Sequence, residues 1–185
     1  MTPARGLGVL VSGSGTNLQA LIDAGLPIVA VAANVAAAPA LERAAGIGAP
    51  TAVFALDDFP DRDARDAVMA DWLESHGTWL VVCAGYMHLL RPAFLDRFPG
   101  RVLNVHPALL PAFPGAHAVA DALAAGVTQT GATVHLVDEG LDTGVVLRQE
   151  AVAVLPGDTP ETLHARIRVV EHRLLPEVVR ELITA

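Results

Sequence analysis

The architecture of this chain follows from the stretch Leu7-Gly8-Val9-Leu10-Val11-Ser12-Gly13-Ser14-Gly15-Thr16-Asn17-Leu18. Its first five residues form a continuous apolar run, which is typical of a strand covered on both faces. Beyond the glycine-rich turn, apolar side chains at positions 18, 20, 21 and 22 recur at helical spacing. A buried strand, a glycine turn and a helix in this order predict an α/β fold.

The glycine-rich turn, residues 12–17, also has the composition of an anion site. Glycines between a strand and a helix let backbone N–H groups turn toward a bound phosphate, and the helix amino end adds a favourable partial charge. A dinucleotide site would need a third glycine where Leu18 stands and an acidic residue where Asn34 stands, so the pattern disfavours NAD. A plain strand-to-helix connection explains the same residues, and this alternative stays open.

The rest of the chain continues the alternation of strands and helices. We expect strands over residues 28–33, 52–54, 79–84, 102–106, 133–137 and 145–147, and helices over 40–45, 62–75, 118–125 and 161–182. Asp57 and Asp58 are expected to cap the helix 62–75. The charged residues of its first turns are expected to form a solvated face: Arg62, Asp63, Arg65 and Asp66.

Composition narrows the possible functions. Lys and Arg number 12 against 20 Asp and Glu, and without a run of basic residues this predicts no nucleic-acid partner. The single cysteine, Cys83, excludes an intramolecular disulfide and a multi-thiolate zinc site, and its apolar neighbours predict a buried side chain. No apolar run reaches spanning length and the amino terminus lacks the regions of a signal peptide, so we expect a cytoplasmic protein with no membrane partner.

Asn104 and His106 stand at the end of an expected strand, directly before Pro107. In an extended chain, side chains two residues apart project to the same side, so the amide and the imidazole converge. Such a pair suits attack on a carbonyl, because it offers a fixed donor where negative charge develops and a proton source for the leaving group. A structural role is the more common explanation of such a pair, with His106 capping the strand end and Asn104 satisfying turn backbone.

Several later segments allow two interpretations. The apolar segment 86–90 either lines a slot for a flat ligand or packs on the core as a short helix. His135 falls on the polar face of its strand, where a hydrogen-bonded sheet histidine is the default. The glycine-bracketed acidic loop 138–144 has the composition of a solvated loop, and His164 and His172 are expected on the surface of the final helix.

Five segments together carry a resemblance to a known family: Ser12-Gly13-Ser14-Gly15-Thr16-Asn17-Leu18, Ala84-Gly85-Tyr86-Met87, Asn104-Val105-His106-Pro107-Ala108-Leu109-Leu110-Pro111, His135-Leu136-Val137-Asp138 and Leu141-Asp142-Thr143-Gly144. In this order and spacing, the chain resembles the folate-dependent formyltransferases from about residue 7 to the final helix. The resemblance implies a three-layer, Rossmann-like α/β fold whose mostly parallel central sheet has an antiparallel carboxyl-terminal part. It implies a single domain over residues 1–185, with a nucleotide and phosphate half (about 1–100) and a catalytic and folate half (about 101–185).

Within that family, the chain is most similar to the branch that works in de novo purine (IMP) biosynthesis. The implied reaction moves the formyl group of 10-formyltetrahydrofolate to the amine of glycinamide ribonucleotide, giving N-formylglycinamide ribonucleotide and tetrahydrofolate. The folate is a co-substrate, and no tightly bound cofactor is implied. The partners would be small molecules, and the enzyme a monomer or homodimer. The alternatives are a formyltetrahydrofolate deformylase or another folate-dependent formyltransferase such as the one acting on methionyl-tRNA, although this chain is too short for the extra domains of those relatives.

The resemblance also assigns roles to residues. Asn104 would donate to the oxyanion, His106 would transfer protons, and Asp142 would stabilise the charged imidazole. The residues implied to bind glycinamide ribonucleotide are Gly15, Thr16, Asn17 and Glu171. The residues implied to bind the folate are Arg62, Met87, His88, Leu89, Leu90, Asn104, Asp138 and Asp142. Arg62 is placed by approximate spacing only, and His88 stands where some relatives have arginine.

Two interpretations come from other classes of protein. A metal-dependent hydrolase would use His106, His135 and Asp142, but metal-ligand spacing on one element is lacking, and we expect no metal site. A nucleotide- or folate-binding module would bind without turnover, although Asn104, His106 and Asp142 together argue against it.

Overall fold

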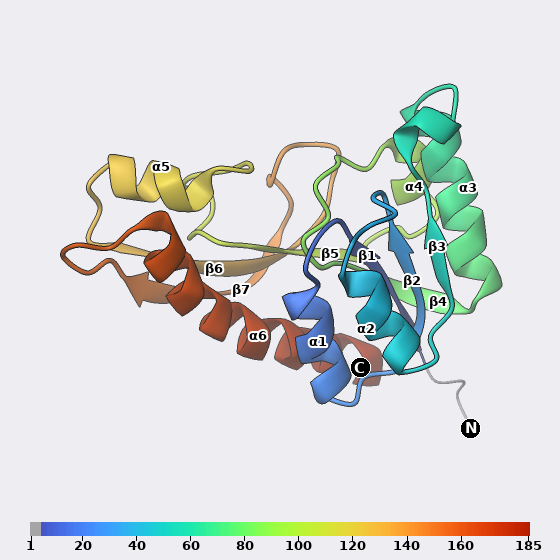
Figure 1. Ribbon diagram of the computed structural model, residues 1–185, viewed down its shortest axis with the longest axis horizontal. Coiled ribbons are helices and arrows are strands. Elements are labelled where there is room, and N and C mark those ends of the chain that lie inside the picture. Colours follow the sequence, from blue (N-terminus) through green and yellow to red (C-terminus); the bar gives the residue numbers. More distant parts are fainter. Residues whose placement is uncertain (1–4) are drawn as a thin grey trace.

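The computed structural model describes residues 5–185, so the first four residues of the predicted domain lie outside the description. A single seven-stranded sheet runs through the molecule in the order β3-β2-β1-β4-β5-β6-β7 (Figure 1). Its strands are β1 (Gly6–Val11), β2 (Ile28–Ala33), β3 (Thr51–Val53), β4 (Thr78–Cys83), β5 (Val102–His106), β6 (Gln129–Leu136) and β7 (Val146–Ala153). The first five strands pair in parallel, whereas β6 pairs antiparallel with both β5 and β7. This confirms the expected α/β fold with an antiparallel carboxyl-terminal part.

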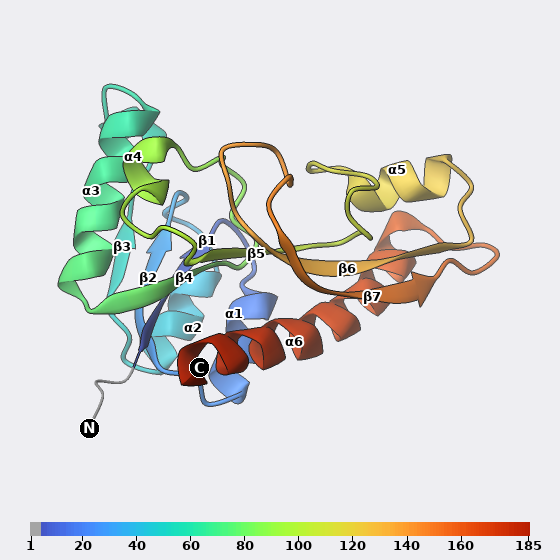
Figure 2. The same ribbon diagram turned by 180° about the vertical axis from the view of Figure 1, so that it is seen from behind.

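Helices cover both faces of the parallel part, which gives the three expected layers (Figures 1 and 2). On one face lie α1 (Thr16–Asp23), α2 (Ala40–Gly46) and α6 (Pro160–Thr184), and on the other lie α3 (Arg62–Ser75) and α4 (Pro92–Leu95). Alternate residues of β1 separate into two cores, because Val9 packs with the first group and Leu10 with the second. A smaller third core joins α5 (Ala118–Ala124) to α6 and the antiparallel strands.

The predicted solvated face of α3 is confirmed for Arg62 and Asp63 but wrong for Arg65 and Asp66. The helix has the expected bounds, but Arg65 and Asp66 are completely buried, because position 65 shares the inward face with Met69 and Leu73 at four-residue spacing. Charged residues are usually exposed, so the sequence pattern gave no sign that this side of the helix faces the core. The predicted cap is also wrong: Asp61 accepts a hydrogen bond from the Ala64 N–H, while Asp57 and Asp58 belong to a separate 3₁₀ turn, η1 (Leu56–Asp58).

Other boundaries differ from expectation, most of all in the antiparallel strands, where β6 begins at Gln129 and not at residue 133. The strand expected at 145–147 extends to Ala153, because its polar positions alternate along the outer edge of the sheet while it pairs with β6. Residues 86–90 form no helix and run as an irregular segment past the end of β4.

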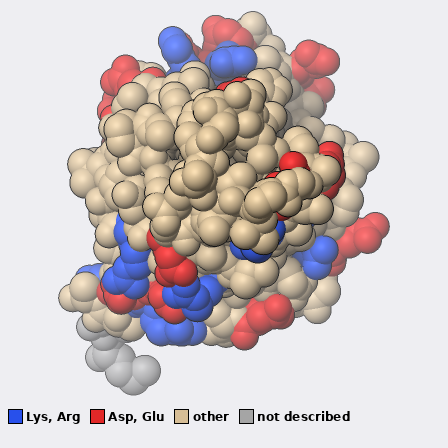
Figure 3. Space-filling model, turned by 90° about the vertical axis from the view of Figure 1, so that its left-hand side faces the viewer, with Lys and Arg blue, Asp and Glu red and all other residues tan. Residues whose placement is uncertain are grey.

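Surface charge is mixed on the face that Figure 3 presents, which is the end of the molecule near α5. Arg side chains there lie among Asp and Glu side chains, and much of that face is uncharged. Across residues 5–185, none of the helices combines the length and the apolar character needed to cross a membrane.

Candidate active site

A cavity of about 410 Å³ lies beyond the carboxyl ends of β1, β4 and β5. Carboxyl ends of neighbouring parallel strands meet at one edge of the sheet, which is where ligand sites form in such folds. The walls come from the glycine-rich turn, the segment after β4, the end of β5, the loop after β6 and α6. The lining residues are 13–17, 83–90, 104–107, 115, 116, 135, 137, 138, 140–142, 164, 168 and 171.

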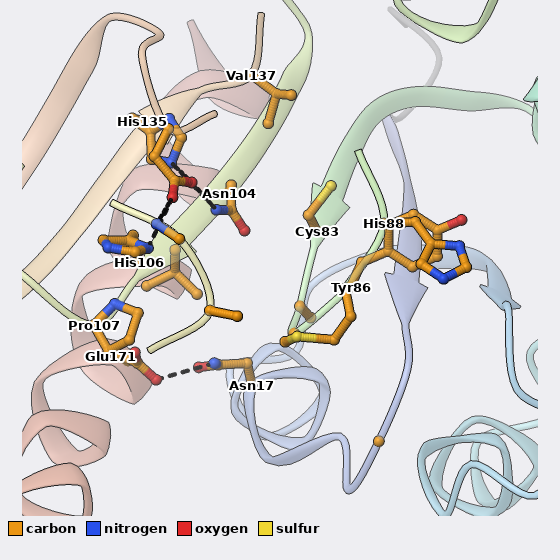
Figure 4. A pocket seen from close by; sticks show the side chains of 18 of the residues that line it. Asn17, Cys83, Tyr86, His88, Asn104, His106, Pro107, His135, Val137 and Glu171 are labelled. Carbon is orange, nitrogen blue, oxygen red and sulfur yellow. Dashed lines mark hydrogen bonds and ion pairs between the residues drawn. The ribbon is translucent and has the colours of Figure 1, made fainter. Parts of the chain in front are cut away.

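Asn104 and His106 lie near each other at one end of this cavity (Figure 4), and the Asp142 carboxylate lies beside both of them. The Asn104 amide nitrogen lies 3.5 Å from Oδ1 of Asp142, and Nδ1 of His106 lies 3.4 Å from Oδ2. Asn104 and His106 share a face of β5, as their spacing predicts. Asp142 reaches them from a loop almost forty residues further along the chain.

The loop 138–144 is built to hold Asp142 in place. Asp142 adopts a positive φ of 55°, and its Oδ2 accepts a 2.7 Å hydrogen bond from the Gly115 N–H. The Asp138 carboxylate accepts hydrogen bonds from the Gly140 N–H and the Thr143 hydroxyl, which close the loop on itself. The loop is therefore an ordered wall of the cavity and not only a solvated connection.

The imidazole of His106 is held on both sides. Its Nε2 lies 2.7 Å from the carbonyl oxygen of Phe113, and its Nδ1 faces Asp142. Both neighbours are oxygen acceptors, so a protonated ring satisfies both of its N–H groups in this position. The Thr133 hydroxyl fixes the segment after β5, because it donates to the Ala108 carbonyl and accepts from the Leu110 N–H.

His135 also belongs to this cluster, although the sequence indicated only a sheet histidine or a possible metal ligand. It stands opposite Asn104 in the β5–β6 ladder, and its Nε2 lies 3.2 Å from the Asn104 amide nitrogen and 3.6 Å from Asp142. Burial is the main cause that lowers the pKa of His135, so the ring is neutral at pH 7, with Nδ1 donating to the Leu136 carbonyl and Nε2 accepting from Asn104. The alternation of its strand showed that His135 is on the polar face, but not that this face meets Asn104.

The opposite end of the cavity is formed by the glycine-rich turn and α6. Gly15 caps α1 with a positive φ of 71°, and the turn 13–17 lines the cavity. The Asn17 amide donates to Glu171 at 3.2 Å, while its own oxygen Oδ1 is buried without a protein partner within residues 5–185. Glu171 is only 3 % exposed, and burial raises its pKa. Glu171 also lines the cavity, so it is not part of the exposed surface of α6.

The predicted folate segment, Met87 to Leu90, forms another wall of the cavity. Met87 is 67 % exposed, while Leu90 is buried beneath the segment. The Met87 N–H donates to the Ser12 hydroxyl at 2.9 Å, which ties this segment to the glycine-rich turn.

His88 is fixed by a residue that the sequence placed on the surface. Nη1 of Arg65 lies 2.6 Å from Nδ1 of His88, and because a guanidinium only donates, Nδ1 must be the unprotonated nitrogen. Burial, followed by the charge of Arg65, lowers the pKa of His88, which agrees with a neutral ring. Arg62 is exposed at the start of α3 and is not among the residues that line the cavity, so the structure does not bring it to the other predicted site residues.

Comparison with known proteins places this geometry in a family. The family model described as "Formyl transferase" matches residues 7–179. The chain belongs to the formyl transferase family. It is 53 % identical to phosphoribosylglycinamide formyltransferase of Mycobacterium tuberculosis (strain H37Rv), with 98 % of this chain and 86 % of that protein covered. It is 44 % identical to the trifunctional purine biosynthetic protein adenosine-3 of Drosophila pseudoobscura pseudoobscura, over 96 % of this chain and 14 % of that protein.

Solved structures agree with the sequence relatives. The structure of glycinamide ribonucleotide transformylase 1 from Symbiobacterium toebii superposes with a TM-score of 0.96 at 44 % identity, covering all of this chain and 90 % of that one. At this level of identity the likeness covers both the fold and the sequence of the chain.

Other titratable groups of this formyltransferase complete the site. Cys83 is buried as expected and lines the cavity, and burial raises its pKa to about 12, which keeps the thiol protonated. His164 and His172 are partly buried and not freely exposed as predicted, and His164 also lines the cavity. Over the described part of the chain, no group of three or more His, Cys, Asp or Glu side chains is placed to hold a metal ion.

Proposed function

We propose that this chain transfers the formyl group of 10-formyltetrahydrofolate to the amine of glycinamide ribonucleotide, a step of de novo purine biosynthesis. The observation that carries the proposal is the meeting of Asn104, His106 and Asp142 at one end of a cavity whose other end is a glycine-rich turn. The first end suits acyl transfer and the second suits a phosphate, so one cavity serves both halves of the reaction. The folate acts as a co-substrate and not as a resident cofactor.

In this proposal the substrate amine attacks the formyl carbon and produces a tetrahedral oxyanion. Asn104 donates an amide N–H to that oxyanion, where the charge develops. Its nitrogen carries two hydrogens: His135 accepts one at 3.2 Å, and Asp142 holds the other only at 3.5 Å. The weakly held hydrogen is the one that turns to the oxyanion. His135 thus fixes the amide without contacting the reacting atoms.

Proton transfer is assigned to His106. Its Nε2 is engaged by the Phe113 carbonyl, so Nδ1, beside Asp142, is the nitrogen left to exchange a proton with the reacting groups. The Asp142 carboxylate stabilises the imidazolium. Loss of a proton from the attacking amine and its delivery to the departing folate nitrogen balance the reaction, and orienting two substrates in one cavity supplies further acceleration.

Substrate contacts follow from the walls of the cavity. Backbone N–H groups at Gly15, Thr16 and Asn17 bind the phosphate of the ribonucleotide, and Glu171 contacts the remainder of that substrate. The apolar wall Met87 to Leu90 receives the flat ring of the folate, opposite the backbone around Asp138 and Asp142. A folate contact by Arg62 stays a prediction of the sequence, as do the cytoplasmic location, the monomeric or homodimeric state and the division into two halves.

The test is an absorbance assay of the purified chain with both substrates, combined with a measurement of released formate. Formation of tetrahydrofolate only when glycinamide ribonucleotide is present, without free formate, supports the transferase. Formate release that does not depend on the ribonucleotide would identify a deformylase and overturn the proposal, and binding of both substrates without turnover would identify a binding module.

A further inference from the structure

Arg43 lies on α2, behind the glycine-rich turn, and has no role in the reaction proposed above. Its Nε donates to the Ser14 carbonyl at 2.8 Å, and its Nη1 donates to the Gln19 side chain at 3.0 Å. The Gln19 amide in turn donates to Asp23 at 2.8 Å. Arg43 therefore connects α2 to both the turn and the helix α1 that follows it.

A second contact from α2 acts on the preceding peptide of the turn. The Ala40 N–H donates to the Gly13 carbonyl at 3.1 Å. The two helices also meet closely, since a Cβ added to Gly15 would lie 2.5 Å from Cβ of Ala40. The carbonyls of two successive peptides, at Gly13 and Ser14, are thus both held on the α2 side of the turn.

The direction of these carbonyls fixes the direction of the N–H groups. In a planar trans peptide the C=O and N–H bonds point in opposite directions. With the Gly13 and Ser14 carbonyls turned toward α2, the N–H groups of Ser14 and Gly15 point away from it. Neither N–H donates to an acceptor within residues 5–185. Gly13, Ser14 and Gly15 line the cavity, whereas Arg43 does not, so the side away from α2 is the cavity side.

We propose that Arg43 is a positioning residue that orients the backbone N–H groups of the glycine-rich turn toward the phosphate of the substrate. Ser14 and Gly15 then form a concave pair of donors for an anion, continuous with the amino end of α1. Because Arg43 acts from behind the turn, its removal leaves the formyl-transfer cluster intact and weakens only the recognition of phosphate. This inference rests on the proposed function, which supplies the phosphorylated substrate.

The experiment compares Arg43→Met and Arg43→Lys with the unchanged protein. Methionine keeps an apolar stem but removes both hydrogen bonds, and lysine keeps one donor for the Ser14 carbonyl. For Arg43→Met we expect KM for glycinamide ribonucleotide to rise about ten- to a hundredfold, as for loss of a hydrogen bond between charged or strongly polar groups. KM for the folate and kcat at saturation should stay within about twofold, and Arg43→Lys should recover most of the loss.

A substrate without the phosphate separates positioning from a general structural role. The unphosphorylated glycinamide riboside should be used equally by the unchanged protein and by Arg43→Met, because it never occupies the turn. Arg97→Met is the matched control: Arg97 also makes two side-chain hydrogen bonds, to Asp71 and Glu74, but is not among the residues that line the cavity. An unchanged KM for the ribonucleotide, or an equal loss with the riboside, would overturn the inference.

Binding of inorganic phosphate, measured by calorimetry, gives a readout that does not require turnover. Phosphate should bind the unchanged protein and bind Arg43→Met about tenfold or more weakly. If Arg43→Met fails to fold, Gln19→Leu, which removes the partner of Nη1, replaces it and should show a smaller loss in the same direction. If phosphate binding depends on Arg43 but no formylated product forms, the proposed function is contradicted and the positioning role of Arg43 still stands.

Discussion

Two clusters each contain a carboxylate and histidine. The first is Asp66 with Arg65 and His88, and the second is Asp142 with His106 and His135. They differ in how completely the carboxylate is paired. In the first, Asp66 is fully buried, Arg65 holds its Oδ1 at 2.6 and 2.8 Å, and the Arg91 N–H holds its Oδ2 at 2.8 Å. In the second, Asp142 is 11 % exposed; the Gly115 N–H holds its Oδ2 at 2.7 Å, but its Oδ1 lies 3.5 Å or more from Asn104 and His135. A carboxylate with both oxygens tightly paired serves the scaffold, whereas one with a loosely paired oxygen beside a cavity is available for chemistry.

The largest expected effect is a loss of catalytic activity when a residue of the Asp142 cluster is changed. His106→Ala should lower kcat about 10²- to 10⁴-fold, because it removes the group assigned to proton transfer. Steady-state kinetics with both substrates measure the effect, and unfolding by urea shows whether the variant keeps its fold. Asp121→Asn, an exposed carboxylate on α5, is the control and should keep full activity. If the activity of His106→Ala stays within tenfold of that of the unchanged protein, the assignment of proton transfer to His106 is wrong.

Changes to the fully paired cluster, Arg65 and Asp66, should lower the stability of the protein and leave catalysis largely unchanged. Asp66→Asn leaves the charge of Arg65 buried without its counter-ion, so we expect the free energy of unfolding to fall by about 3–5 kcal/mol. Urea unfolding measures the change, and kcat of the fraction that remains folded should be little affected.

A double variant sharpens this prediction. Arg65→Met combined with Asp66→Leu removes both buried charges and should recover a large part of the lost stability, because apolar residues of similar volume often replace a buried ion pair at little cost. A double variant less stable than Asp66→Asn would show that the pair contributes more than mutual neutralisation.

A smaller effect is expected at the phosphate end of the cavity. Gly15→Ala places a side chain at a positive φ and against Ala40, so it should raise KM for glycinamide ribonucleotide about tenfold by moving the turn. Gly25→Ala is the matched control, since Gly25 has a similar φ of 67° but no atom within 4 Å of the added Cβ. Both variants should lose stability, but only Gly15→Ala should change KM.

The smallest effect is a pH dependence of stability. Burial lowers the pKa values of His88 and His135 below the ordinary 6.5, so the unfolded chain binds more protons just below that pH. Their contribution is complete above pH 6.5 and is lost as the pH falls toward the lowered values. Glu171 acts in the opposite sense, because its raised pKa favours the folded state at low pH and loses that contribution as the pH rises.

Urea midpoints between pH 7.5 and pH 5.5 measure this dependence. The urea concentration at the midpoint of unfolding should decrease as the pH is lowered. His88→Gln should make this decrease smaller, since glutamine does not titrate. A slope unaffected by His88→Gln would mean that the contact with Arg65 does not keep the ring neutral.

Local patterns predicted much of the fold. The strand at 28–33 and the helix at 62–75 have the predicted bounds, because apolar periodicity and helix-start signals act within a few residues. The same reasoning put Asn104 and His106 on one face of a strand. It failed for Arg65 and Asp66, since charge alone does not show which side of a helix meets the core.

Local sequence patterns set the order of strands and helices, the glycine-rich turn and the paired amide and imidazole. The family resemblance already assigned Asp142 to that pair, but the contacts of His135 with Asn104, of Glu171 with Asn17 and of Arg65 with His88 appear only in the folded chain. The physical reason is the range of the interactions. Periodicity and capping are set by neighbours along the chain, whereas these contacts join separate elements, whose pairing depends on how the whole sheet and its helices pack.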